Sequence, residues 1–217
     1  MLVAALNKEV ERYERYIQEA GLMMNLLELE TFSLARAVVG KRPGLSIILD
    51  IGARATNLIV VEDGLVKVSR NLDVGGKDIT KTLVESLGIT YERADALKKS
   101  GKDFLNNPES KLLFPALQMI GNEAKRMLGA YQSKHPEARC ESVVLSGGSG
   151  QFAGLTEYFS KYLDLPVRLG NPWERIQYDH KLSESVDRMG TSFSVAIGLA
   201  LSGVDAVLEK KQKSGAP

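Results

Sequence analysis

The sequence has 217 residues, of which 44% are apolar and 25% are charged, and its formal net charge is +1 at pH 7. This length suffices for one or two domains with a sizeable core, and the proportions are those of ordinary globular proteins. Since the charge is almost balanced, we exclude a long-range field that would recruit nucleic acid or an anionic membrane.

The sequence shows no sign of secretion or membrane insertion. Its single cysteine, Cys140, cannot form an internal disulfide, and its place beside an apolar run indicates a reduced core thiol in the cytosol. Charged residues such as Lys8 and Glu9 fall where a signal peptide would need an apolar core. The most apolar late stretch, residues 193–201, is too short to span a bilayer.

Residues 1–40 have the pattern of half a small α/β domain, as if the start of the chain had been cut from a longer one. We expect a strand at 2–5, a helix from the N-cap Asn7 to residue 20, a strand at 26–30 and a helix at 32–39. Such a half has too little apolar surface to be stable alone. Met23 and Met24 are expected either in a partner interface or, more often, at core positions along a cut edge. The glycines of 40–44 mark a boundary.

Three strands open the fuller second part of the chain. Buried strands are expected at 46–49 and 57–61, close enough in sequence to pair antiparallel. Asp63-Gly64 is a strong hairpin signal, because both positions favour the positive φ of a tight turn, and it leads into a strand at 65–70.

Helices dominate the rest of the chain. Apolar spacing predicts helices at 78–87, 91–99, 110–132, 152–163 and 193–201, the last one buried. A buried strand ending in a glycine turn is expected at 142–150, and a short exposed strand at 165–169. The polar tail from about residue 209 is expected to be disordered.

Chemistry-bearing clusters are few. The sequence contains no metal-ligand cluster and no nucleophile triad, and the two histidines, His135 and His180, stand in polar loops as surface residues. Two strand-to-turn transitions remain. Asp50-Ile51-Gly52 places a carboxylate before a turn whose amides can hold a phosphate, while the acid holds a cation or water. The glycines of 146–150 let a ring or a phosphate approach the backbone. The alternative is that both are structural turns.

Together these motifs resemble one lobe of an actin-like ATPase. The segments concerned read DIGARATNLIVVEDGLVKVSRNLDVGGKDIT, ADALKK, VVLSGGSGQFAGLTEYFSKYLDLPV, NPWERI and SFSVAIGLAL. More narrowly, the sequence resembles the PilM family of type IV pilus assembly, relatives of the division protein FtsA. Its details NLIVVEDG and GGKDIT point to this pilus branch.

The resemblance implies a fold and a division of the chain. The expected fold class is α/β: an actin-like, ribonuclease H-like lobe with a mixed five-stranded sheet and flanking helices, preceded by a partial small α/β subdomain. Residues 1–40 would be the end of the small inserted (SHS2-like) domain and a linking helix. Residues 45–203 would be the second, nucleotide-binding lobe, and 204–217 a tail.

The resemblance also assigns a nucleotide site. It implies a phosphate hairpin at Asp50, Gly52 and Thr56, followed by a glycine break before a helix at Gly75 and Gly76. Asp95 and Lys98 would contact the ribose. Gly147, Gly148 and Ser149 would form the adenosine turn. Asp50 would also approach Mg²⁺ through a bound water. The sequence departs from the family at Arg54 and Ala55, where small or hydroxyl residues are common, and at Asn57, where FtsA carries an acid.

Only half of the family's nucleotide clamp is expected here. Forty-nine residues precede Asp50, and they contain no other D-x-G turn. A ligand held from one side loses the advantage of groups preorganised on both sides of the phosphates. We therefore expect that ATP and Mg²⁺, the cofactors of the full-length family, bind weakly or not at all, and that this chain is not an enzyme.

The implied function is a cytoplasmic scaffold of the pilus assembly platform. The implied partners are the cytosolic tail of a PilN-like membrane protein, the pilus motor ATPases and other platform proteins. These partners would hold the protein at the inner face of the cytoplasmic membrane. No nucleic acid is expected as a partner. A homodimer would use the exposed lobe face. Three alternatives stay open: a nucleotide-free component of a type II secretion-like system, an FtsA-like division lobe, and a complete nucleotide-dependent enzyme.

Overall fold

The structure, a computed structural model, describes residues 4–107 and 112–214. The chain forms two units, one up to Glu30 and one from Thr31 onward. The division precedes the predicted boundary at 40–44, because the helix expected at 32–39 packs in the second unit. Ser110, the predicted start of a helix, and Leu2 and Val3 of the strand predicted at 2–5 lie outside the described residues.

The first unit contains one helix and an irregular segment. Leu6 occupies the N-cap position of helix α1 (Asn7–Glu19) without a side-chain capping bond, so Asn7 lies inside the helix and not at its N-cap. Residues 22–29 form neither helix nor strand, so the strand predicted at 26–30 is wrong; Ala4 and Ala5 are not in a strand either. A strand is completed only by hydrogen bonds to a neighbour, and the described part of this unit offers none. Met23 is 86% exposed.

The second unit is built on a mixed sheet that, within the described residues, has five strands in the order β3-β2-β1-β4-β5. The strands are β1 (Leu45–Ile51), β2 (Thr56–Glu62), β3 (Leu65–Leu72), β4 (Cys140–Ser146) and β5 (Val167–Leu169). The first three are antiparallel neighbours, while β4 runs parallel to both β1 and β5. The predicted mixed five-stranded sheet is confirmed. So is the hairpin, since Asp63 and Gly64 both have positive φ.

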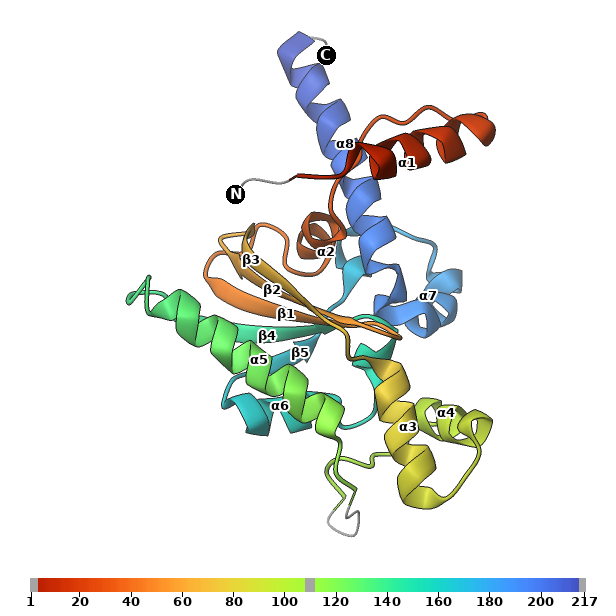
Figure 1. Ribbon diagram of the computed structural model, residues 1–217. Coiled ribbons are helices and arrows are strands. Elements are labelled where there is room, and N and C mark those ends of the chain that lie inside the picture. The colour runs from red at the N-terminus through yellow and green to blue at the C-terminus, as the bar shows by residue number, and fades with distance from the viewer. Residues whose placement is uncertain (1–3, 108–111, 215–217) are drawn as a thin grey trace. The chain divides into compact units, whose positions relative to one another are not determined.

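Helices cover both faces of the sheet (Figure 1). One face carries α3 (Gly76–Leu87), α4 (Tyr91–Lys99), α5 (Pro115–Gln132) and α6 (Leu155–Leu163), and the other carries α2 (Glu30–Val38) and α8 (Ser194–Ser214). Side chains of a strand alternate between faces, so Ile47 and Leu49 enter the first core and Ile48 the second. Burial on both faces explains why β1 reads as a continuous apolar run.

The remaining elements are short. They are the helix α7 (Ser183–Met189) and the 3₁₀-helices η1 (Gly148–Gln151), η2 (Pro172–Arg175), η3 (His180–Leu182) and η4 (Gly190–Phe193). None of the helices in the described part of the chain combines the length and apolar composition needed to cross a membrane.

Helices α2 and α3 begin two residues before their predicted starts, and three other helices differ more from their predicted bounds. Helix α5 begins at Pro115, a residue suited to the first helical position, and α6 begins at Leu155 after Gly154, whose φ is +81°. Helix α8 continues to Ser214, through residues 209–214 that were predicted to be disordered. The helix is not fully buried as predicted, because it lies in the outer layer and only one of its faces meets the sheet. Ile197 packs in the core with α2, whereas Leu199 is 41% exposed.

Two glycines of α8 test this packing. A β-carbon at Gly198 would lie 1.9 Å from the Ser33 carbonyl oxygen of α2, whereas one at Gly203 would meet nothing within 4 Å. We expect Gly198→Ala to lower the free energy of unfolding by about 1–3 kcal/mol, because backbone has to move. Gly203→Ala should raise it by about 0.5–1 kcal/mol through helix propensity. Denaturant unfolding measures both, and equal effects of the two substitutions would contradict the close contact.

Candidate functional site

The two glycine-bearing corners lie side by side at the carboxyl ends of β1 and β4. The parallel register pairs Asp50 with Ser146. A β-carbon at Gly147, whose φ is +80°, would lie 2.5 Å from the Ile51 carbonyl oxygen and 3.0 Å from Oδ1 of Asp50. Only glycine allows this approach of the two corners.

The start of α3 closes against both corners. The backbone amides of Gly76 and Lys77 donate to the carbonyl oxygens of Gly52 and Ala53, each at 2.8 Å. A β-carbon at Gly76 would lie 2.0 Å from Oγ of Ser149, and this hydroxyl donates to the Gly52 carbonyl at 3.4 Å. Three segments far apart in sequence therefore meet through backbone and small side chains.

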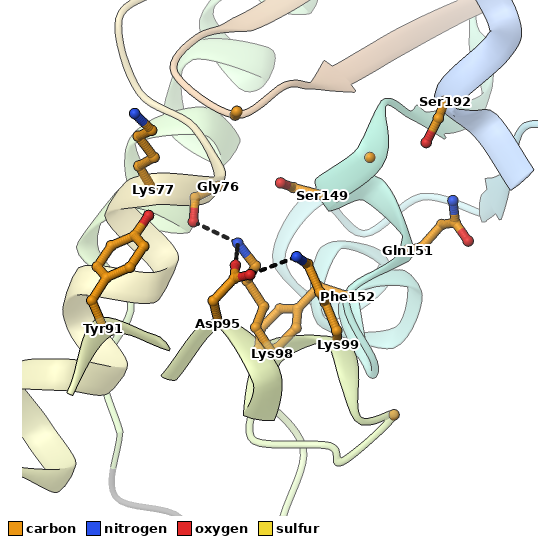
Figure 2. A pocket seen from close by; sticks show the side chains of 13 residues that line it. Gly76, Lys77, Tyr91, Asp95, Lys98, Lys99, Ser149, Gln151, Phe152 and Ser192 are labelled. Carbon is orange, nitrogen blue, oxygen red and sulfur yellow. Dashed lines mark hydrogen bonds and ion pairs between the residues drawn. The ribbon is translucent and has the colours of Figure 1, made fainter. Parts of the chain in front are cut away.

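A cavity of about 670 Å³ opens where these segments meet. Figure 2 shows it bounded by α3 and α4 on one side and by η1 and η4 on the other. Its lining residues are Ala53, Gly76, Lys77, Tyr91, Asp95, Lys98, Lys99, Gly101, Gly148, Ser149, Gln151, Phe152 and Ser192.

The predicted site residues divide into two groups. Five of them line the cavity: Gly76, Asp95, Lys98, Gly148 and Ser149. The other five, Asp50, Gly52, Thr56, Gly75 and Gly147, lie in or beside the wall behind it.

Hydrogen bonds of the wall residues stabilise the turn that follows β1. The fully buried Thr56 hydroxyl donates to the Val74 carbonyl at 2.7 Å, which places it behind the turn. The Gly52 amide donates to the Ala55 carbonyl at 3.0 Å and so closes the turn itself. Asp50 is half-buried between its register partners Asn57 and Ser146.

Lys98 connects α4 to the start of α3. Its side chain is only 12% exposed, and its Nζ donates to the Gly76 carbonyl at 3.0 Å and to Oγ1 of Thr80 at 2.8 Å. Nζ also lies 3.3 Å from Oδ1 of Asp95. A cation removed from water needs such partners, so Lys98 fixes the wall of the cavity as well as charging it.

Asp95 accepts from two lysines. Lys99 donates to its Oδ2 at 2.5 Å, and this hydrogen bond, with a smaller contribution from Lys98, holds the pKa of the Asp95 carboxyl below its ordinary value against the opposing effect of burial. Asp95 thus stays ionised and offsets part of the positive charge on this wall.

Several lining residues were missed by the sequence analysis. Tyr91 and Lys99 share one face of α4 with Asp95 and Lys98, at spacings of i, i+4, i+7 and i+8, so helical periodicity could have found them. Gln151 and Ser192 lie within the quoted segments VVLSGGSGQFAGLTEYFSKYLDLPV and SFSVAIGLAL, but the resemblance assigned neither of them to the nucleotide site. Arg54 is exposed and does not line the cavity; the lining residue from the turn after Asp50 is Ala53.

The cavity suits an anionic ligand that also has a flat or apolar part. Lys77, Lys98 and Lys99 outnumber the single carboxylate of Asp95, and the buried ring of Phe152 adds apolar surface. Within the described ranges no group of three or more His, Cys, Asp or Glu side chains is placed to hold a metal ion. His135 and His180 are exposed, as predicted.

Comparison with known proteins gives a family match and distant relatives. The family model described as type IV pilus assembly protein PilM matches residues 1–204. The cell division protein FtsA of Neisseria meningitidis is 27% identical over 225 aligned residues, which cover 91% of this chain and 52% of that protein. FtsA of Enterococcus faecalis is 24% identical, covering 75% and 42%. The chain spans about half the length of the curated relatives it matches.

Solved structures share the fold. The structure titled PilM-PilN type IV pilus biogenesis complex has a TM-score of 0.68 and 26% identity, covering 92% of this chain and 59% of that one. MreB5 of Spiroplasma citri bound to ADP has a TM-score of 0.64 and 18% identity, covering 97% and 68%. The actin-like fold class is confirmed.

The cluster on α4 gives a titration test. Because the Lys99 hydrogen bond is the main cause of the lowered pKa of Asp95, Lys99→Ala should raise that pKa toward its ordinary value. A lowered pKa means that the ionised Asp95 stabilises the fold above the carboxyl's ordinary titration range, and that this stability is lost as pH falls through the folded-state pKa. NMR titration of the Asp95 carboxyl carbon measures the shift.

The matched control is Lys81→Ala, which removes a lysine that pairs with Glu85 on the exposed surface of α3. It should leave the pKa of Asp95 unchanged. An unchanged pKa in Lys99→Ala would assign the main effect to Lys98 instead.

Proposed function

The chain belongs to the family of type IV pilus assembly protein PilM, and on that premise we propose that it is a cytoplasmic, actin-like scaffold of the pilus inner-membrane assembly platform that contributes one half of an ATP-binding cleft. The observation that carries the nucleotide half of this proposal is the single cavity shared by the corner after Asp50 and the turn at Gly148.

We assign the nucleotide to this cavity by its chemistry and its place in the fold. MreB5, which shares the fold, has been solved with ADP and with AMPPNP. In our proposal the adenosine lies on Gly147, Gly148 and Ser149, and Asp95 and Lys98 face the ribose.

The phosphates in this arrangement lie toward the Asp50–Gly52 corner. Thr56 and Gly75 hold this corner from behind, and Gly76 forms its edge with the cavity.

Magnesium fits this arrangement only when the phosphates supply further ligands. The corner offers the single carboxylate of Asp50, and Mg²⁺ is commonly bound through one or two carboxylates, substrate phosphates and several waters. Asp50 would hold the ion through a water. The chemistry that the ion supplies is neutralisation of phosphate charge.

A weak site without turnover follows from what these residues supply. Among the described residues, the proposed phosphate contacts lie on one side only, at the Asp50–Gly52 corner. Binding then lacks preorganised groups around the transferring phosphate, which are the main source of catalysis in phosphoryl transfer.

Scaffolding is the activity that we propose for this chain. The structural neighbour solved as a PilM-PilN complex supports a PilN-like protein as one partner. The binding of its cytosolic tail, and the pilus motor ATPases and platform proteins as further partners, are part of the proposal. The second candidate, an FtsA-like division lobe, is favoured by the 27% identity to FtsA. The family match over residues 1–204 favours the pilus role.

Nucleotide binding is tested by filling the cavity. A β-carbon at Gly148 would make only an ordinary contact, 3.7 Å from Oγ of Ser192, so Gly148→Leu is expected to fold and to occupy the ligand's space. We expect the chain to bind ATP-Mg²⁺ in calorimetry with a dissociation constant of about 1 mM or weaker, and Gly148→Leu to abolish this binding. Gly129→Leu on α5, where a β-carbon would meet nothing within 4 Å, is the matched control. Tight binding would refute the half-cleft.

The scaffold role is tested by affinity purification of the tagged intact gene product from its source cell. Co-purification of a PilN-like protein with pilus motor ATPases is the expected result. Recovery of division proteins in their place would favour the FtsA-like role, and recovery of secretion components the type II alternative.

A further inference from the structure

A chain of buried hydroxyl groups lies behind the glycine turn of the cavity. Oγ1 of Thr191 donates to the Gly147 carbonyl at 2.7 Å, and Oγ of Ser194 donates to the Thr191 carbonyl at 2.7 Å. Oγ of Ser146 lies 3.2 Å from Oγ of Ser194 and donates to it. All three side chains are almost completely buried, with Thr191 2% exposed.

These hydroxyls join segments that are distant in sequence. Ser146 ends β4, Thr191 lies in η4 and Ser194 begins α8. A hydroxyl buried without a partner costs about 1–3 kcal/mol, so three of them gathered at one point are tolerated only because each one is hydrogen-bonded. The bond from Thr191 ends on the backbone of the turn that lines the cavity.

Holding the Gly147 carbonyl also fixes the next amide. In a planar trans peptide the C=O and the following N–H point in opposite directions, so the hydrogen bonds on the Gly147 carbonyl set the direction of the Gly148 amide. Gly147, with φ +80°, has more rotational freedom than other residues. The Gly150 amide donates to its carbonyl at 3.1 Å from within the turn, and Thr191 adds a second, shorter bond from outside it. Gly148 itself lines the cavity, as does Ser192, the neighbour of Thr191.

We propose that Thr191, supported by Ser194 and Ser146, is a positioning residue of this site: it holds the Gly147–Gly148 peptide in the orientation in which the Gly148 amide donates to the bound nucleotide. The nucleotide part rests on the function proposed above. The positioning part concerns the protein alone and can be measured without ligand.

Two substitutions at residue 191 separate the hydroxyl from the bulk of the side chain. Thr191→Val keeps the volume and removes the donor, whereas Thr191→Ser keeps the donor. Thr31→Val is the matched control, because the Thr31 hydroxyl is also buried and has no hydrogen-bond partner within the described part of the chain. Trp173, the single tryptophan, donates through Nε1 to the Gly190 carbonyl at 3.0 Å, so its fluorescence reports whether η4 stays packed.

The first measurement uses the protein without ligand. Loss of one hydrogen bond worth about 1 kcal/mol should raise hydrogen exchange of the amides at 147–151 about fivefold in Thr191→Val. Thr191→Ser and Thr31→Val should stay within about twofold of the unsubstituted protein, and tryptophan emission should be unchanged in all three. Unchanged exchange in Thr191→Val overturns the proposal, whatever nucleotide does.

The second measurement follows the Gly148 amide by NMR during titration with ATP-Mg²⁺. The initial slope of its shift against ATP concentration should fall about fivefold in Thr191→Val and be retained in Thr191→Ser. Equal slopes in the unsubstituted protein and Thr191→Val overturn the role in ligand binding. If exchange rises in Thr191→Val while the unsubstituted protein shows no shift with ATP, positioning of the turn is supported and the proposed nucleotide function fails.

Discussion

The parallel pairing of β1 with β4, in which Asp50 stands opposite Ser146, is the constraint on which the whole site depends. It brings two corners from distant parts of the sequence into one plane, and the lack of a side chain at Gly147 lets them touch. The start of α3 then closes against both corners through backbone hydrogen bonds. Ligand sites commonly form beyond the carboxyl ends of strands in α/β sheets, because the loops there diverge and leave backbone groups exposed.

Charge on the α4 wall serves both structure and recognition. Lys98 is nearly buried, and its hydrogen bonds to Gly76 and Thr80 fasten α4 to α3. Asp95 offsets part of this charge, while Lys77 and Lys99 leave the cavity with an excess of cations. The same lysines that stabilise the wall therefore also give it a positive charge.

The second face of the sheet gives the site its backing. Helices α2 and α8 pack there, and an Arg36 guanidinium hydrogen bond to the Gly198 carbonyl, at 2.9 Å, joins them. Since α8 begins at Ser194, next to the hydroxyl chain behind Gly147, the glycine turn and this helical layer share one buried network.

Local sequence determined much of this protein. Dihedral preferences and periodicity within a few residues predict the Asp63-Gly64 hairpin, the amphipathic α3 and α4, and the two glycine corners. The quoted motifs indicated the family. Tertiary structure alone decided the rest. Residues 26–30 have strand-like composition but no pairing partner, and α8 is exposed on one side. Ser192 begins the quoted segment SFSVAIGLAL and Thr191 precedes it, but only the folded chain brings them to the site. Hydrogen-bond partners and packing neighbours depend on which distant segments the folded chain brings together, and no local pattern records that.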